Sequence, residues 1–285
     1  MACVRVKRAR RALVFGEALI DSFPDKRVVA GAPLNLATYL AARGWSVAIV
    51  SRLGRDADGR RIFDELTRRG VDTSLLEWDD ALPTGEVTVE IDGGTNSFDV
   101  HEPAAWDAIE GPDHPPIGDV LSFGTLAQRH ERSRAALGRL LAAATGMLRV
   151  FDPNLRFPHV DQEALATGLE AADVIKLNRE EMGMIAQLKG FEPTPRGYFE
   201  AGARLQWLCI TEQSGAELHR RSGEAFYATA PPVEIVDTVG AGDAFAAGLI
   251  DGLVENVSPQ EALNRGLAAA TEAVSVRGGL APAKD

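Results

Sequence analysis

The sequence predicts an α/β protein with a doubly wound, mostly parallel sheet flanked by helices. Two observations carry this prediction. Short apolar runs alternate with segments whose apolar residues recur at helical spacing, almost throughout the chain. A chain of 285 residues is also long enough to bury a sizeable core. We therefore expect a single domain over residues 1–285.

The predicted elements follow one another as strand and helix pairs. The first half of the chain contains the strand ALVFGEALI, the helix PLNLATYLAARG, the strand WSVAIVSRLG and the helix DGRRIFDELTRRG. The second half contains VLSFGTL before ERSRAALGRLLAAA, LRVFDPN before DQEALATGLEAA, VIKLN before REEMGMIAQL, and finally LCIT. Ligands of such sheets bind beyond the carboxyl ends of the strands, so we expect the site at the strand-to-helix loops.

Two segments break this rhythm. Residues 84–101 alternate apolar and polar side chains on both sides of DGG, which predicts a β-hairpin. We expect this hairpin to stand outside the main sheet, as a lid or as the surface of a homodimer. Residues 216–230 predict a second hairpin around RSGE.

Composition excludes several classes of protein. The chain has 30 Lys and Arg against 41 Asp and Glu, and its net charge of −11 disfavours binding to nucleic acid or to anionic membranes. No stretch is long and apolar enough to span a bilayer. Cys3 and Cys209 are too few for a disulfide framework, and the five histidines are scattered. We expect a cytoplasmic protein without a zinc site.

The stretch DTVGAGDAF, residues 237–245, predicts a glycine-rich loop that opens a helix. The glycines Gly240 and Gly242 allow a bound group to approach the backbone closely. The first N–H groups of the helix have no partner inside it and can bind an anion such as a phosphate. Asp243 would then lie beside that anion. The alternative is a simple glycine turn, with Asp243 as a first-turn acid favoured by the helix dipole.

Polar residues gather at two more loops near the start of the chain. The stretch GEALID ends a predicted strand with Asp21, and AGAPLN places Gly31 and Asn35 at the entry to a helix. Such a trio could hydrogen-bond several hydroxyl groups of a ligand. Taken singly, the same residues could equally be strand-end and helix-cap residues.

The stretches FDPNLR and KLNREE end two later strands. Asn178 and Glu181 are three residues apart at a helix start, so both can face the same side. An amide and a carboxylate could hold Mg²⁺ through its waters. A helix-capping pair is the structural alternative.

Together, these stretches resemble the ribokinase-like family of sugar kinases, also called the PfkB family. The resemblance covers nearly the whole chain, in the order GEALID, AGAPLNLATYLAARG, SRLGRDADGRRIFDELTRRGVDTSLL, FGTL, FDPNLR, KLNREE and DTVGAGDAFAAG. The resemblance implies a ribokinase-like fold with a small β lid, formed by the hairpin at about 84–101 and a strand segment near residues 20–30. It also implies ATP-dependent transfer of a phosphoryl group to a sugar.

The roles that the resemblance implies fall into three groups. Asp243 is the catalytic base, and the N–H groups of Gly240, Ala241 and Gly242 form an anion hole for the transferred phosphoryl group. The sugar is bound by Asp21, Gly31, Asn35 and Arg156, together with Asp243. The nucleotide is contacted by Lys176, Asn178, Thr211 and Gly242, Mg²⁺ is held through water by Asn178 and Glu181, and K⁺ lies near Asp237 and Val239.

The chemistry of phosphoryl transfer agrees with these roles. The protein mainly positions groups and stabilises negative charge that spreads over the phosphoryl group. A helix N-terminus does this without a lysine-bearing P-loop, and the sequence contains no G-x-x-x-x-G-K-[ST].

Two positions depart from the family pattern. Ala30 replaces the first of the paired glycines before the early helix, and Gln213 stands where a glycine usually follows Thr211. The first could narrow the sugar pocket, and the second could crowd the nucleotide.

The motifs are most similar to those of fructokinases, so fructose or a close ketose is the expected substrate. 2-Keto-3-deoxygluconate kinases and nucleoside kinases remain alternatives. Arg156 is the residue that favours a sugar acid as the substrate, because a guanidinium can pair with a carboxylate. A sensor that binds a sugar or nucleotide without catalysis is the alternative of another class, and the retained Asp243 argues against it. A dinucleotide-dependent oxidoreductase would need G-x-G-x-x-G after the first strand, where GEALID stands instead.

Overall fold

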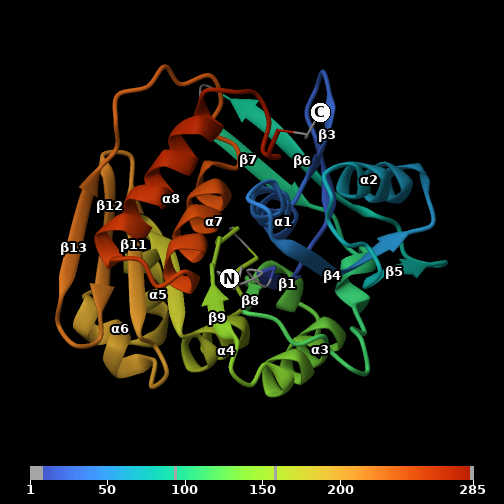
Figure 1. The fold of residues 1–285 in the computed structure, drawn as a ribbon. Coiled ribbons are helices and arrows are strands. Elements are labelled where there is room, and N and C mark those ends of the chain that lie inside the picture. The colour runs from blue at the N-terminus through green and yellow to red at the C-terminus, as the bar shows by residue number, and fades with distance from the viewer. Residues whose placement is uncertain (1–8, 93–94, 157–158, 283–285) are drawn as a thin grey trace, which may run out of the picture.

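A nine-stranded sheet, here called the large sheet, lies at the centre of the computed structural model, which describes residues 9–92, 95–156 and 159–282 (Figure 1). Its strands lie in the order β13-β12-β11-β10-β9-β8-β1-β4-β5. All neighbours from β11 to β5 are parallel, whereas β12 and β13 add an antiparallel edge. The bounds are β1 Arg11–Phe15, β4 Ser46–Gly54, β5 Leu76–Asp79, β8 Val120–Phe123, β9 Leu148–Phe151, β10 Val174–Asn178, β11 Trp207–Glu212, β12 Gly215–Arg220 and β13 Ala225–Thr229.

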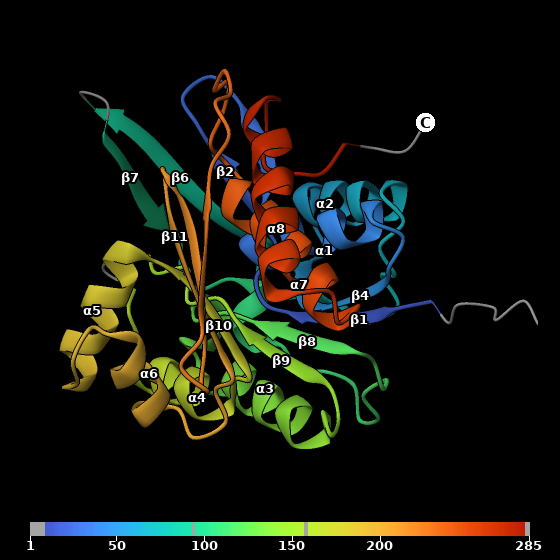
Figure 2. The same ribbon diagram turned by 60° about the vertical axis from the view of Figure 1, so that its left-hand side comes forward.

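Helices cover both faces of the large sheet, as the strand and helix rhythm predicts (Figure 2). One layer consists of α1 Ala32–Ala42, α2 Ala57–Arg68, α7 Ala241–Val254 and α8 Pro259–Val274, and the other of α3 Glu131–Ala143, α4 Gln162–Ala171, α5 Arg179–Lys189 and α6 Pro195–Ala201. Alternate residues of a strand serve the two layers. In β1, Leu13 and Phe15 join the core under α3 to α5, while Val14 joins the core under α1 and α7.

A second sheet, here called the small sheet, has the strand order β3-β2-β6-β7 within the described residues. Its strands are β2 Leu19–Ser22, β3 Arg27–Ala30, β6 Gly85–Asp92 and β7 Thr95–Val100. The antiparallel pair of β6 and β7 is the predicted hairpin at 84–101, and the glycines of its tip, 93–94, lie outside the described residues. The small sheet extends beyond the carboxyl end of β1 (Figure 2).

The apolar run ALVFGEALI differs from its prediction as one strand. It forms two strands in two sheets, β1 and β2, joined through residues 16–18. Asp21 is consequently not at the end of a strand of the large sheet. It lies within β2 of the small sheet, where it is paired with Val28 and Val87. The chain passes from β1 to β2 close to Pro33 of α1. A Cβ at Gly16 would lie 2.3 Å from the Pro33 side chain, so this passage requires glycine.

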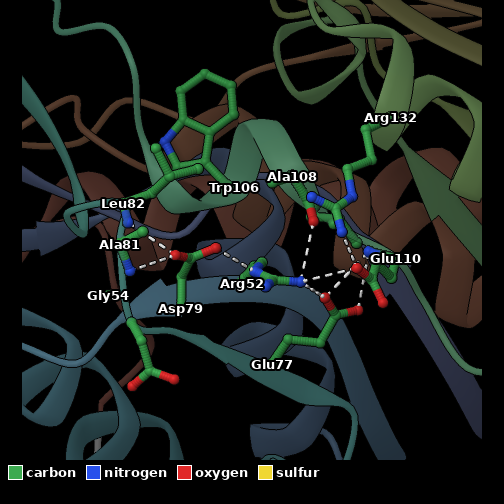
Figure 3. A network of polar contacts seen from close by, with 12 residues as sticks. Arg52, Gly54, Glu77, Asp79, Ala81, Leu82, Trp106, Ala108, Glu110 and Arg132 are labelled. Atoms are coloured by element: carbon green, nitrogen blue, oxygen red, sulfur yellow. Dashed lines mark hydrogen bonds and ion pairs between the residues drawn. The ribbon is translucent and has the colours of Figure 1, made fainter.

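A polar network fastens the edge strand β5 to its neighbour β4 (Figure 3). The Arg52 guanidinium donates to Asp79 at 2.7 Å, to Glu77 at 2.9 Å and to the Ala108 carbonyl at 3.2 Å. The second oxygen of Asp79 accepts the Ala81 and Leu82 N–H groups, and these bonds hold the pKa of Asp79 below its usual range. The network also joins the short 3-10 helix Ala105–Ala108 to the large sheet. A second 3-10 helix is Leu126–Gln128.

None of the described helices is both long enough and apolar enough to cross a membrane.

Candidate active site

The stretch DTVGAGDAF forms the loop and helix start that its glycines predict. Gly240 is the N-cap of α7 and has a left-handed backbone with φ of 79°. A Cβ at Gly240 would lie 2.4 Å from the Gly279 carbonyl oxygen, so only glycine fits. Of the three amides predicted to form an anion hole, that of Ala241 donates to the Thr238 carbonyl at 3.3 Å. The N–H groups of Gly242 and Asp243 lie in the first turn, where a helix offers no acceptor.

The N-terminus of α1 lies beside that of α7. The Asn35 side-chain amide donates to the Asp243 carboxylate at 2.8 Å. Gly31 is the N-cap of α1 with φ of 123°, and a Cβ there would lie 2.7 Å from the Glu17 carbonyl oxygen. The hydrogen bond of Asn35 thus joins the start of α1, where the predicted sugar-binding residues Gly31 and Asn35 lie, to the predicted catalytic loop more than 200 residues later in the sequence.

A buried lysine lies next to the start of α7. The Lys176 ammonium on β10 donates to Asp152 at 2.9 Å. A Cβ built on Gly242 would lie 3.1 Å from the Lys176 nitrogen, so the ammonium lies against the first turn of α7. Asp152 follows β9, and its other carboxylate oxygen is buried and has no hydrogen-bond partner among the residues that the structure describes.

The charged groups of this cluster shift one another's pKa values. Burial raises the pKa of the half-buried Asp243 to about 7, with a further contribution from Asp152, while Lys176, Asn35 and Arg156 act in the opposite direction. Burial lowers the pKa of Lys176, but Asp152, Glu181 and Asp243 together raise it above its usual value. Asp243 can therefore exchange a proton near neutral pH beside a lysine that stays charged.

Asn178 and Glu181 form the helix cap that was the structural alternative for this pair. The Asn178 side chain accepts the Glu181 N–H at 2.8 Å, and Glu181 accepts the Asn178 N–H at 2.9 Å. The other oxygen of Glu181 accepts the Leu155 N–H at 2.8 Å. Burial, and then Asp152, raise the pKa of Glu181.

The oxygen donors of the site could hold a hydrated metal ion. In the described part of the chain, no three His, Cys, Asp or Glu residues are grouped so that they could hold a metal ion directly. The Asp152 oxygen that has no partner among the described residues, and the Glu181 carboxylate, which accepts one amide at each oxygen, nevertheless keep acceptor capacity for water. Oxygen acceptors of this kind fit a Mg²⁺ that keeps its waters and is carried by a nucleotide.

Asp21 and Arg156 form the side of the site next to the small sheet. Burial raises the pKa of Asp21 to about 6, and the nearby Arg156 lowers it. The Arg156 guanidinium lies 5.4 Å from the ring centre of Phe98 on β7 and donates to the Leu155 carbonyl. Arg156 thus connects the loop after β9 with the predicted hairpin.

The remaining predicted residues lie at two flanks of the cluster. Thr211 is paired with Asn178 on the neighbouring strand, and its hydroxyl donates to the Leu177 carbonyl at 3.3 Å. The Asp237 carboxylate accepts the N–H groups of Val239 and Gly278, at 3.0 and 3.1 Å, which ties the loop before α7 to the segment after α8.

Two acids of the site were not among the predicted site residues. Asp152 stands in FDPNLR and pairs with Lys176, while Glu17 stands in GEALID and lines a cavity together with Asp152 and Asp243. Glu17 is only 5% exposed. A carboxylate between two apolar strands is the signal that identifies Glu17, since acids are rarely buried without a reason.

The α/β fold brings the first turn of α7, the Asp243 carboxylate and the Lys176 ammonium to one place. A family model described as pfkB family carbohydrate kinase matches residues 7–285. The chain therefore belongs to the PfkB family, whose members are phosphotransferases acting on sugar hydroxyls.

Known relatives agree with this assignment. A fructokinase from Klebsiella pneumoniae is 32% identical over 264 residues, which cover 86% of this chain and 85% of that protein. A 5-dehydro-2-deoxygluconokinase from Geobacillus kaustophilus is 30% identical, with 87% and 79% covered. Among solved structures, the fructokinase from Vibrio cholerae O395 in its fructose, ADP and calcium ion bound form has a TM-score of 0.81 and 25% identity, with 95% and 94% covered.

Proposed function

We propose that this sugar kinase transfers the γ-phosphoryl group of ATP to a hydroxyl of fructose or a closely related ketose. The observation that carries the proposal is the convergence of three groups at the start of α7. Asp243 accepts from Asn35 at 2.8 Å, and the Lys176 ammonium lies against Gly242. A base, a fixed cation and the first amides of a helix at one point are what phosphoryl transfer requires.

Asp243 takes the proton of the attacking sugar hydroxyl. With a pKa of about 7 it is a better base than an exposed aspartate, yet it remains ionised in a good fraction of molecules at neutral pH. The Gly240 and Gly242 amides and the Lys176 ammonium stabilise the charge that spreads over the transferred group. The Ala241 amide joins them when its 3.3 Å bond to Thr238 is released.

Lys176, Asn178, Thr211 and Gly242 contact the nucleotide, and Asn178 and Glu181 hold the waters of its Mg²⁺. When bound, Mg²⁺ neutralises phosphate charge. Asp152 supplies a further acceptor through its unpartnered oxygen. Because Glu181 also caps α5, its orientation is set by the Asn178 and Leu155 amides before any nucleotide arrives.

The sugar binds between α1 and the small sheet. Asp21, Gly31, Asn35 and Arg156 face its hydroxyls, and Asn35 at the same time orients Asp243. Residues 1–285 form one kinase domain, and the small sheet acts as the lid of its sugar site. Arg156 contacts this lid through Phe98. Exclusion of water by such a lid protects the phosphoryl group from hydrolysis.

Two further features belong to the proposal. A K⁺ ion near the backbone of Asp237 and Val239 stabilises the loop before α7. The side-chain carboxylate of Asp237 already accepts hydrogen bonds from two amides. A homodimer forms through the exposed side of the small sheet. The expected location is the cytoplasm.

The test is ADP release by the purified protein with ATP and Mg²⁺ over a panel of ketoses, aldoses, sugar acids and nucleosides. Fructose-dependent turnover that falls by about 10²-fold or more in Asp243→Asn supports the proposal. Fructose binding without turnover, measured by calorimetry, would instead support a sensor. Turnover with another acceptor alone would refute the substrate and keep the kinase.

A sugar-acid kinase is the second candidate, and Arg156 is the observation that favours it. The guanidinium can pair with a substrate carboxylate in two parallel hydrogen bonds. The relative that acts on 5-dehydro-2-deoxygluconate, by its name, shows that neighbouring family members use acceptors other than fructose. Nucleosides belong to the same panel as the third class of acceptor.

A further inference from the structure

Glu17 is an acid inside the site to which the proposed reaction assigns no role. It follows β1, is only 5% exposed, and lines the cavity shared by Asp152, Asn154 and Asp243. The carboxylate receives a hydrogen bond from its own backbone N–H. Among the residues that the structure describes, no other side chain forms a hydrogen bond or an ion pair with it. A buried acid without a side-chain partner costs stability, so a use within the cavity has to account for it.

Burial raises the pKa of Glu17 to about 7; Arg156 and Arg129 lower it, and Asp243 raises it further, so these three groups act electrostatically on Glu17. Arg129 is already compensated, because it pairs with Asp107 at 2.7 Å and with Glu102 at 3.0 Å. Arg156 has no such ion pair within the described ranges, and its guanidinium lies over Phe98. Arg156 is therefore the cation whose charge Glu17 can offset.

Acids outnumber cations around Arg156. Arg156 lowers the pKa values of Glu17, Asp21 and Asp243, which places all three carboxyl groups within its electrostatic reach. Asp243 has to be ionised for catalysis and Asp21 faces the sugar. A substrate carboxylate that paired with Arg156 would enter the field of these acids, and like charges brought together in a partly buried site oppose binding.

We propose that Glu17 is a specificity residue that makes the acceptor pocket discriminate against anionic sugars. Its carboxylate offsets the charge of Arg156 and accepts a hydrogen bond from a hydroxyl of a neutral sugar. The inference rests on the proposed function, because it concerns the acceptor side of the same site. It selects the neutral ketose over the sugar acid by a built-in repulsion, a device that specific sites use alongside attraction.

The test compares fructose with 2-keto-3-deoxygluconate at pH 8.5, above the pKa of about 7 of Glu17, in wild type and in Glu17→Gln, which keeps the shape and removes the charge. The ratio of kcat/KM for the acid to that for fructose rises by at least about tenfold in the variant. Glu17→Asp, which keeps the charge, retains the wild-type ratio. Glu180→Gln removes the same charge from the exposed first turn of α5 and leaves the ratio unchanged.

A double variant locates the effect. In Glu17→Gln combined with Arg156→Met, the gain for the acid disappears, because Arg156, the cation that would pair with the substrate carboxylate, is gone. An unchanged ratio in a Glu17→Gln protein that melts cooperatively, or a gain that persists without Arg156, overturns the inference.

Calorimetric dissociation constants for the same two sugars separate this inference from the proposed function. Turnover of fructose with an unaltered ratio in Glu17→Gln removes the inference and leaves the kinase. A shifted ratio of dissociation constants, in a protein that phosphorylates neither sugar, supports the inference and refutes the proposed function.

Discussion

At the scale of single residues, burial decides what the carboxyl groups of the site can do. Asp243, Glu17 and Asp21 all have raised pKa values, and burial is the largest cause for each. Lys176 and Arg156 act against this shift but do not cancel it at Asp243. The result is a base poised near neutral pH, which an aspartate in water is not.

This pKa gives the reaction a pH dependence. Because only ionised Asp243 can accept the proton, kcat/KM for the sugar rises with pH and levels off above about pH 7. Initial rates from pH 5.5 to 9 at saturating ATP measure the profile. A flat profile over this range, as expected of an aspartate that titrates near its ordinary value of about 4, would contradict the assigned environment.

Lys176 and Asp152 form a pair whose two contributions can be separated. Lys176→Met lowers kcat by about 10²-fold or more, since it removes the fixed cation beside Gly242. It also lowers the melting temperature, because the charge of Asp152 is left without its partner. Adding Asp152→Asn restores stability without restoring kcat. Recovery of both quantities in the double variant would mean that Lys176 acts only structurally.

At the scale of elements, the start of α7 depends on a backbone that only glycine adopts. Gly240 has φ of 79° and packs against Gly279, whereas Gly183 lies within α5 with open space around its Cα. The two glycines therefore have opposite expectations for the same substitution.

Gly240→Ala lowers the free energy of unfolding by more than about 1 kcal/mol and strongly reduces kcat, because strain and a 2.4 Å contact displace the helix start. Gly183→Ala is the matched control and raises stability by up to about 1 kcal/mol, since alanine favours a helix interior. Chemical denaturation and steady-state rates measure both. Normal activity in Gly240→Ala would show that the loop is not the catalytic one.

At the scale of the whole molecule, the buried acids of the site make the free energy of unfolding depend on pH. The folded pKa of Asp243 is about 7 against an ordinary value of 3.8. Stability from a raised carboxyl pKa is fully present below the unfolded value and is lost as pH rises through the folded value. Asp21 and Glu17 act in the same direction, with folded pKa values of about 6 and about 7.

We therefore expect the ligand-free protein to lose stability between about pH 4 and pH 7, as these acids ionise. Asp243→Asn makes the loss smaller, and Asn35 keeps an acceptor in the new amide. Urea unfolding of both proteins at pH 5.5 and pH 8 measures the difference. Identical pH dependence in the two proteins would show that Asp243 is not perturbed in the folded state.

Much of the fold follows from patterns that are local in sequence. Apolar runs predict the buried strands, helical periodicity predicts α1 to α5 and α7, and alternation predicts the hairpin of β6 and β7. The glycines of DTVGAGDAF predict the helix start that carries Asp243. These features are readable because each depends on residues a few positions apart.

Only the tertiary structure decides the rest. The run ALVFGEALI reads as one strand, but its two halves bury their apolar side chains in different sheets. The pairing of Lys176 with Asp152, its contact with Gly242, and the burial of Glu17 beside Asp243 depend on segments far apart in the chain. Local sequence determined which groups stand at the strand ends; burial and long-range proximity, which exist only in the folded chain, decided their charges and partners.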